Sequence, residues 1–259
     1  MNWAKQWLHY IKIRFMEHLQ YPGNSLFFLI GFFLTQFQGP IFVLALYNAG
    51  ATIQGWTKWE IVLLQGLFSI VGGTAFTYFW GLTYKTSTYV RDGRLELFRA
   101  RPISTLRLVM MHSFHVQDYS QILAGIVITL IAASHLPITI AGIIKASLYA
   151  IPGILFLLGL TILAAALQVH FTNVPRMGEI LGSLLDYTKF PKRAFGVAQA
   201  SLVSLSPLFL INYYPTKALL NEPITLTGFT YSLLTGTVIL IAGIIYWNYA
   251  LTTYQGAQG

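Results

Sequence analysis

Residues 19–57 read LQYPGNSLFFLIGFFLTQFQGPIFVLALYNAGATIQGWT and contain no Lys, Arg, Asp or Glu. A helix needs about 20 apolar residues to cross the hydrocarbon core of a bilayer, so this stretch is long enough to span one. Five further uncharged stretches follow: Ile61–Tyr84, Tyr119–Ile144, Ala146–Pro175, Ala194–Thr216 and Pro223–Gly259. The pattern predicts an all-α membrane protein with six transmembrane helices in a single domain, residues 1–259.

The composition excludes an ordinary soluble domain. Only 9% of the 259 residues are charged and 55% are hydrophobic, whereas a soluble domain has about 25% charged residues. The helices of a soluble protein would need charged residues every three or four positions to face water, and the six uncharged stretches have none. Helices that are apolar all round lie in lipid or are fully buried. The chain has no cysteine, which leaves no disulfide, thiol nucleophile or thiolate metal site to consider.

Basic residues define the expected orientation of the spans. The expected spans are Ser25–Tyr47, Ile61–Thr83, Tyr119–Leu136, Leu148–Phe171, Ala194–Tyr214 and Phe229–Leu251. Basic residues on the side of the termini are Lys5, Lys12, Arg14, Lys85, Arg91, Arg94, Arg99, Arg101, Arg107, Arg176, Lys189, Lys192 and Arg193. The opposite side has Lys58, Lys145 and Lys217. Basic loops stay in the cytosol, so we expect both termini there. The net charge of +8 then reflects topology and attraction to anionic lipid, and no nucleic-acid partner is expected.

The N-terminal segment, residues 1–22, predicts an amphipathic helix in the membrane interface. Its apolar positions recur every four residues, and its polar positions lie on the far side of the helix. The apolar set is Trp3, Trp7, Ile11 and Phe15, and the polar set is Lys5, His9 and Lys12. Because Arg14 falls within the apolar stripe, a flexible basic tail remains the alternative.

Two loops depart from simple turns. The cytosolic loop 85–118 breaks at Asp92 and Gly93, continues as the short amphipathic stretch Arg94–Arg101 and stops at Pro102, which predicts a short helix that docks a soluble partner. The external loop 212–228 combines two prolines with an apolar patch. It is either a segment that dips back into the membrane, where protein must shield its backbone, or an ordinary surface loop.

The sequence shows no catalytic constellation. A phosphate-binding loop, a nucleophile elbow and paired carboxylates within a span are all missing. His112, His115 and Asp118 have a spacing that a metal site could use, but ordinary residues at the mouth of a span explain them as well, and we predict no metal and no cofactor on this chain. Because no acidic residue stands in the middle of a span, as an ion-driven transporter would need, we expect a separate polypeptide to supply the energy.

Residues 89–104, YVRDGRLELFRARPIS, resemble the cytosolic segment of type 2 ATP-binding-cassette (ABC) exporter permeases, in which a Gly-x-Leu-Glu pattern followed by Pro lies between the second and third spans. Phe190–Lys192, Asn212–Pro215 and the ending Tyr254–Gly259 are similar to a bacterial branch of that family with six spans. Arg94, Arg99 and Arg101 make the segment more basic than is usual for the family.

The resemblance implies a permease subunit in a bacterial inner membrane, which pairs with an identical or homologous second permease and with two cytosolic ATPase subunits that bind ATP and Mg²⁺. Residues 1–22 would be the connecting helix. The coupling residues would be Arg91, Asp92, Gly93, Arg94, Leu95, Glu96, Leu97, Phe98, Arg101 and Pro102. Uncharged polar residues expected along the translocation path are Gln36, Gln38, Gln65, Tyr78 and Asn212. The alternative is an ion-coupled secondary transporter or channel that acts without an ATPase.

Overall fold

The computed structural model describes residues 3–171, 177–191, 194, 207–222 and 226–254. In this part of the chain every regular element is a helix and no β-strand occurs. The helices in chain order are α1 (Trp3–Leu19), α2 (Pro22–Thr35), α3 (Gln38–Asn48), α4 (Lys58–Tyr78), α5 (Leu82–Arg91), α6 (Arg94–Arg99), α7 (Thr105–His112), α8 (Tyr119–Ala133), α9 (Ile140–His170), α10 (Met177–Asp186), η1 (Tyr187–Lys189), η3 (Pro207–Leu210), α12 (Tyr213–Leu219) and α13 (Leu226–Thr253).

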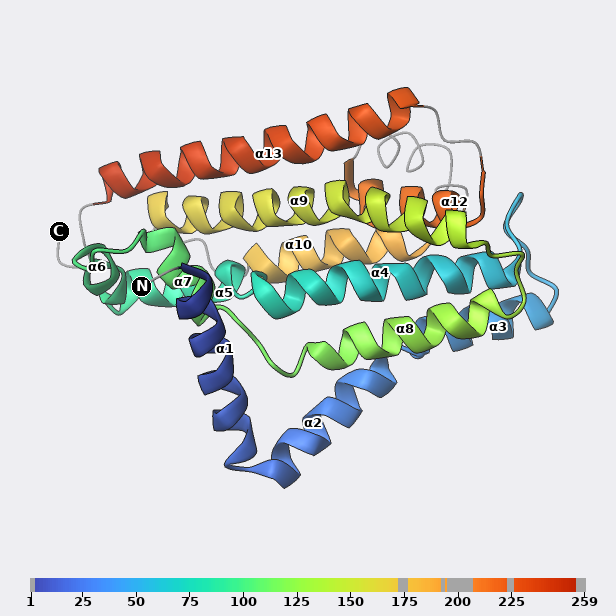
Figure 1. Ribbon diagram of the computed structural model, residues 1–259, viewed down its shortest axis with the longest axis horizontal. Helices are drawn as coiled ribbons and strands as arrows, with labels where there is room; N and C mark the ends of the chain where they lie inside the picture. Colours follow the sequence, from blue (N-terminus) through green and yellow to red (C-terminus); the bar gives the residue numbers. More distant parts are fainter. Residues whose placement is uncertain (1–2, 172–176, 192–193, 195–206, 223–225, 255–259) are drawn as a thin grey trace.

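The long helices α4, α8, α9 and α13 run along the longest axis of the molecule (Figure 1). Helix α9 packs against α13, and α4 packs against α8. Four segments among the described residues are long and apolar enough to cross a membrane: Pro22–Asn48, Lys58–Arg91, Ile140–His170 and Thr227–Thr253. Helix α8 is apolar but has only 15 residues. The prediction of an all-α membrane protein is therefore confirmed, whereas the count of six spans remains a prediction.

Several helix boundaries differ from those expected. The first expected span is two helices, α2 and α3, which meet at Gln36 and Phe37. Helix α9 begins eight residues before the expected Leu148. Lys145 lies within it with an exposed side chain, so a charged residue does not mark the helix end here. Most of the fifth expected span, Ala194–Tyr214, falls outside the described residues.

Sequence-local capping explains why α4 and α9 start where they do. The hydroxyl of Thr57 accepts a hydrogen bond from the backbone N–H of Glu60 at 3.4 Å, and the carboxylate of Glu60 accepts one from the backbone N–H of Thr57 at 2.7 Å. This reciprocal arrangement satisfies donors that the first turn leaves free. At α9, the hydroxyl of Thr139 accepts from the backbone N–H of Gly142 at 3.1 Å.

Helices α9 and α13 approach each other closely because small residues face the contact. A Cβ atom placed on Gly159 would lie 2.5 Å from the backbone nitrogen of Leu240, and one on Gly243 would lie 2.8 Å from the carbonyl oxygen of Gly159. Such contacts are typical of helices that associate in a membrane, where van der Waals packing replaces the hydrophobic effect between helices.

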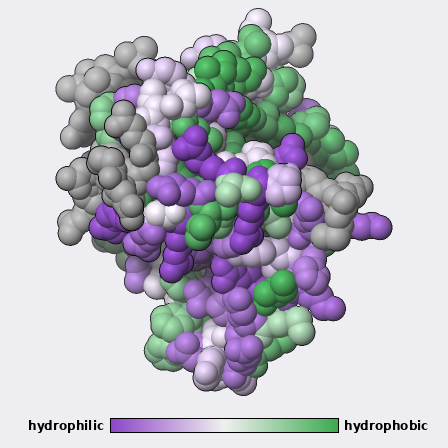
Figure 2. Space-filling view, turned by 90° about the vertical axis from the view of Figure 1, so that its left-hand side faces the viewer, coloured by the Kyte–Doolittle hydropathy of each residue, from purple (hydrophilic) through white to green (hydrophobic). Residues whose placement is uncertain are grey.

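One end of the helix bundle has a polar surface. Helices α6 and α7, the start of α1 and the end of α13 lie at the same end (Figure 1), and hydrophilic side chains gather in the middle of that end face (Figure 2). Large apolar side chains are instead exposed along the length of the bundle, for example Phe27 on α2, Leu130 on α8 and Leu234 on α13. Exposed apolar flanks with a polar end are the surface expected of a protein that lies in a bilayer.

Candidate functional site: the polar end and two cavities in the bundle

Helix α6 turns back sharply from the end of α5. Gly93, which precedes α6, has φ +69° and ψ 3°, the left-handed conformation that glycine adopts without a steric penalty. The turn separates α6 from α5 within two residues, Asp92 and Gly93. The break predicted from the sequence at this dipeptide is therefore present in the fold.

One face of α6 is anchored in the protein core. The side chain of Leu95 is fully buried, and Phe98 is 7% exposed. The ring of Phe98 lies 5.2 Å from the ring of Tyr89 on α5 and 5.0 Å from the ring of His112 on α7, measured between centroids. These contacts attach α6 to both neighbouring helices.

The other face of α6 is exposed at the polar end. Leu97 is 65% exposed and stands among charged neighbours. The ten expected coupling residues thus divide into the buried Leu95 and Phe98, the turn residue Gly93, and seven exposed residues: Arg91, Asp92, Arg94, Glu96, Leu97, Arg101 and Pro102. The arrangement presents an apolar side chain within a charged surface on a helix that the core holds in place.

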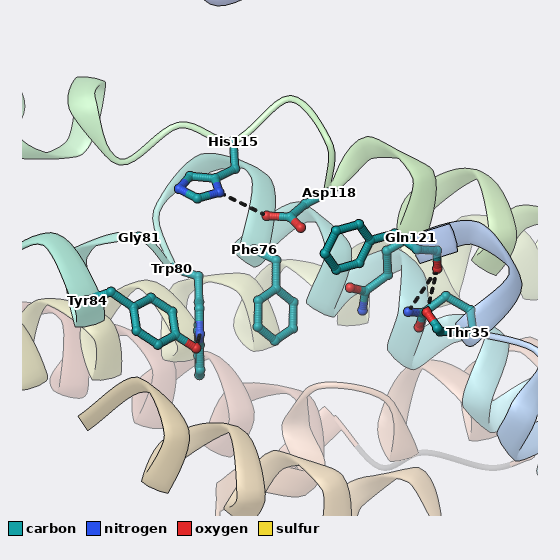
Figure 3. Close-up of a pocket in the computed structure, with 10 residues that line it drawn as sticks. Thr35, Phe76, Trp80, Gly81, Tyr84, His115, Asp118 and Gln121 are labelled. Carbon is teal, nitrogen blue, oxygen red and sulfur yellow. Dashed lines mark hydrogen bonds and ion pairs between the residues drawn. The ribbon is translucent and has the colours of Figure 1, made fainter. Parts of the chain in front are cut away.

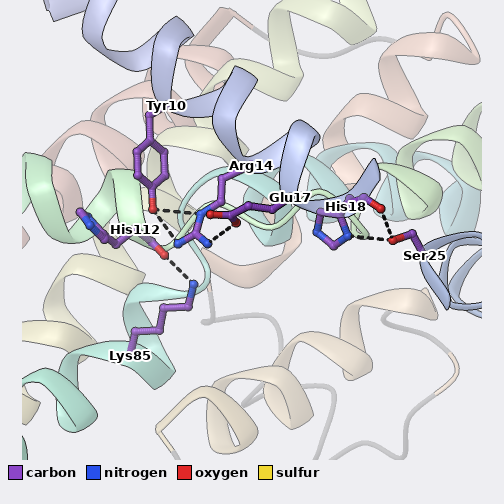
Figure 4. A network of polar contacts seen from close by, with 7 residues as sticks. All are labelled: Tyr10, Arg14, Glu17, His18, Ser25, Lys85 and His112. Atoms are coloured by element: carbon purple, nitrogen blue, oxygen red, sulfur yellow. Dashed lines mark hydrogen bonds and ion pairs between the residues drawn. The ribbon is translucent and has the colours of Figure 1, made fainter. Parts of the chain in front are cut away.

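Helix α1 contacts the same end of the bundle through a polar network (Figure 4). The guanidinium of Arg14 donates hydrogen bonds to the hydroxyl of Tyr10 at 2.6 and 3.0 Å and to the carboxylate of Glu17 at 2.7 Å. The ring of Tyr10 lies 5.1 Å from the ring of His112, whose backbone carbonyl accepts from the ammonium of Lys85. Because His112 also contacts Phe98, ring contacts join α1 to α6 through α7. Arg14 bonds to Tyr10, which faces His112, so Arg14 belongs to the bundle-facing side of α1.

The C-terminal part of the chain adds a contact that the sequence analysis did not foresee. The hydroxyl of Tyr254, which follows α13, donates to the backbone carbonyl of Val90 at 3.4 Å, and the guanidinium of Arg99 lies 5.9 Å from the centre of the Tyr254 ring. Tyr254 stood in the sequence only as part of the family-like ending. Its partners lie more than 150 residues away, so no local signal indicated them.

Three of the expected path residues line one cavity. Gln36, Gln38 and Gln65 border a space of about 220 Å³ between α2, α3, α4 and η1, together with Thr35, Gly39, Pro40, Phe68, Ser69 and Lys189. Gln36 also lines a second cavity, of about 360 Å³, nearer the polar end (Figure 3). The two cavities therefore adjoin at Thr35 and Gln36, which line both.

The other two expected path residues bond elsewhere. The hydroxyls of Tyr78 and Tyr119 are 2.7 Å apart, which links α4 to the start of α8. The amide nitrogen of Asn212 donates to the backbone carbonyl of Thr188 at 2.7 Å. Neither residue is among those that line the two cavities.

Asp118 and His115 line the cavity nearer the polar end (Figure 3), with His115 Nδ1 3.9 Å from Asp118 Oδ2. Burial raises the pKa of Asp118 to about 6 and lowers the pKa of His115 to about 4, with a further lowering by Lys85 and Arg14. At neutral pH a carboxylate therefore faces a neutral imidazole.

His112 bonds through Nδ1 to the carbonyl of Leu108 at 2.8 Å, and in the described parts of the chain no three acidic, His or Cys side chains are placed to hold a metal ion.

Lys189 is a lining residue that the sequence did not assign to a cavity. The charge pattern assigned it to a loop beyond the end of a span. In the structure its ammonium lies 5.1 Å from the centre of the Phe68 ring, at the middle of α4, and 2.7 Å from Asp186 Oδ1. The Asp-x-x-Lys spacing indicates a local ion pair, but only the tertiary fold brings Lys189 to the Phe68 ring.

Apolar helices with a polar end, a short exposed helix and polar cavities between the helices are features of a membrane protein. Comparison with known families agrees, because the model of the ABC-2 family transporter protein matches residues 33–258. The chain therefore belongs to the ABC-2 transporter family, whose members are membrane permease components of ABC transporters. A search of curated proteins gave no significant match.

Proposed function

We propose that this chain is the permease subunit of an ATP-driven exporter and that α6 is the helix on which a separate cytosolic ATPase acts. The observation that carries the proposal is the division of α6 into a buried face, Leu95 and Phe98, and an exposed face around Leu97. A helix that transmits force must be fixed to the moving part and accessible to the driving part, and α6 meets both conditions.

The contacts of α6 suggest how movement would spread. Phe98 touches Tyr89 of α5, and α5 follows α4 in one apolar segment, Lys58–Arg91. Displacement of α6 by a closing ATPase pair would therefore move α5 and α4 as a unit. The contact of His112 with both Phe98 and Tyr10 would move α1 as well. Such rigid-body switching between two states is a common transport mechanism.

The polar end would face the cytosol. The excess of basic residues near that end supports this orientation, and both chain termini would then be cytosolic in a bacterial inner membrane. Helix α1 runs across the axis of the bundle (Figure 1) and exposes Leu8, Phe15, Met16 and Leu19. These side chains suit an interfacial position, where apolar residues enter the boundary between lipid head groups and chains.

The complete transporter would contain two permease subunits, either two copies of this chain or this chain with a homologue, and two ATPase subunits that hold ATP and Mg²⁺.

Helix α12 in the external segment 212–228 is largely buried, since Leu219 packs against Gly142 of α9. This packing supports a segment that dips back into the membrane, because the protein shields its backbone.

Co-purification tests the proposal. The tagged chain, extracted from its native membrane in a mild detergent, should bring down an ABC ATPase that mass spectrometry identifies. The double variant Glu96→Ala/Arg101→Ala should reduce ATPase recovery at least fivefold. The control Lys145→Ala/Glu222→Ala removes exposed charges at the opposite end and should leave recovery unchanged. Proton-dependent transport by this chain alone in liposomes, with no ATPase recovered, would contradict the proposal.

A further inference from the structure

The cavity of about 220 Å³ contains a buried amide without a partner. Gln65 is 3% exposed, and neither its Nε2 nor its Oε1 forms a hydrogen bond with the described residues. A buried amide that has lost its water and gained no protein partner is costly. A ligand that offers both an acceptor and a donor at this point would therefore gain two hydrogen bonds that the protein alone leaves unmade.

Lys189 brings a positive charge to the same cavity. Among the described lining residues it is the one cation, and no acidic residue belongs to the lining. Its partner, Asp186, has a side chain that is 65% exposed and lies outside the lining. Because an ammonium has three donors, Lys189 can keep Asp186 and donate to a second anion inside the cavity.

The position of the cavity restricts what reaches it. Phe68 and Ser69 lie at the middle of α4, so the polar lining is at the depth of the apolar spans. Helix α2 reaches the lining through Thr35 at its C-terminal end and exposes apolar side chains along its length, including Phe27 and Phe28. A ligand whose head group enters beside Lys189 would therefore place an attached apolar chain against apolar protein surface or lipid.

We propose that this cavity binds the head group of an anionic amphiphile, with a carboxylate or phosphate beside Lys189 and further head-group oxygens and hydroxyls paired with the amide of Gln65. The inference rests on the proposed function, since it assigns a cargo class to the same protein. It also changes the expectation of an uncharged path, because one of the lining residues is a lysine.

Equilibrium binding of radiolabelled dodecyl phosphate to the purified full-length chain in a maltoside detergent tests the charge preference. Unlabelled dodecyl phosphate should compete at least tenfold better than dodecyltrimethylammonium of the same chain length, and inorganic phosphate should not compete. Equal competition by the cationic amphiphile would overturn the proposal. Equal competition by inorganic phosphate would also overturn it, because the site would then be a simple anion site.

Two lysines provide a matched pair of variants. Lys217 resembles Lys189, since it pairs with a carboxylate, Glu222, and lies 4.8 Å from the centre of an aromatic ring, Trp56, but it is outside the cavity. Lys189→Gln should weaken dodecyl phosphate binding at least tenfold, whereas Lys217→Gln should leave it unchanged. Equal affinities for the two variants would contradict the proposal.

A steric variant provides a second test that keeps every charge. A Cβ atom on Gly39 would lie 2.9 Å from Oε1 of Gln65, so Gly39→Ala displaces this amide. Gly31→Ala is the control, because nothing lies within 4 Å of its Cβ position. We expect binding to weaken at least threefold for Gly39→Ala alone, and equal binding by both variants counts against the role of Gln65. This pair also decides the case if Lys189→Gln does not fold, as judged by size-exclusion chromatography.

The outcomes separate the two proposals, because binding requires no ATPase. Charge-selective binding through Lys189 with no ATPase partner in native membranes would keep the site and refute the exporter. Recovery of the ATPase through α6 with no charge preference in binding would keep the exporter and refute the site.

Discussion

At the scale of single residues, three glutamines expected along a translocation path border one cavity, and their role in transport stays a prediction. Gln36, Gln38 and Gln65 are polar residues in otherwise apolar stretches, and such residues face other protein groups rather than lipid. Tyr78 and Asn212 have the same character but bond to Tyr119 and to the backbone of Thr188. Sequence alone does not distinguish a polar residue that lines a cavity from one that bridges two segments.

The surroundings of Lys189 could not be read from the charge pattern. Counting basic residues assumes that each one marks the end of a span, whereas Lys189 is held along α4 by Asp186 and by the Phe68 ring. The same fold places Arg14, which blurred the apolar stripe of the N-terminal helix, toward Tyr10 on the bundle side. Arg14 has its partners, Tyr10 and Glu17, on its own helix, whereas Lys189 combines the local ion pair with Asp186 and the ring of Phe68, which only the tertiary structure brings near.

The pair Asp118 and His115 predicts a pH dependence of stability with two opposing parts. The folded-state pKa of Asp118 is about 6, above its ordinary 3.8, so the folded state binds the extra proton and this group stabilises the fold as the pH falls through 6. The folded-state pKa of His115 is about 4, below its ordinary 6.5. The unfolded state then binds the proton, and stability is lost as the pH falls from 6.5 toward 4.

We therefore expect the variant Asp118→Asn to unfold at a higher temperature than the wild type at pH 7.5 and to lose more stability between pH 7 and pH 4.5. His115→Gln should gain stability relative to the wild type as the pH falls from 7 to 4.5, because it lacks the imidazole that the unfolded state protonates. Thermal unfolding of the purified chain in detergent measures both slopes. Asp92→Asn, at the exposed turn before α6, is the control. Identical slopes for Asp118→Asn and the wild type would show that this carboxyl is not buried as described.

At the scale of helices, uncharged length predicted the long helices. The stretches around α4, α9 and α13 follow the expected spans, and the break at Asp92 and Gly93 follows the expected coupling segment. Two boundaries differ from the expected ones: α9 begins earlier because Thr139 caps it, so the exposed Lys145 lies inside the helix, and the first apolar segment, Pro22–Asn48, is divided between α2 and α3. The packing of α9 on α13 through glycines was not predicted.

The glycine contact between α9 and α13 leads to a stability prediction. A methyl group on Gly159 would lie 2.5 Å from a backbone nitrogen of α13, so Gly159→Ala must separate the two helices. Overpacking of this kind costs about 1–3 kcal/mol. Gly31→Ala adds the same methyl group on α2, where nothing is within 4 Å, and should change stability by less than about 0.5 kcal/mol. Thermal unfolding in detergent compares the two, and equal melting temperatures would contradict the α9–α13 packing.

At the scale of the whole molecule, the fold combines apolar flanks, polar cavities within the bundle and one polar end that carries α6, the start of α1 and the end of α13 (Figures 1 and 2). The cavities lie between α2, α3, α4 and the start of α8, and α6 is joined through α5 to α4. Helix α4 thus connects the two: it lines the cavities, and a movement of α6 would reach it through α5. This connection is the physical basis for proposing that ATP hydrolysis outside the membrane controls access to a site within it.

Photocrosslinking from α6 is the most direct test of this coupling. A photoreactive amino acid in place of Leu97, which is 65% exposed, should crosslink the chain to an ABC ATPase in native membranes, and the yield should change when ATP is added. The same amino acid in place of Lys145, at the opposite end, should give no such product. An absence of ATPase crosslinks from position 97, or an equal yield from position 145, would contradict the account.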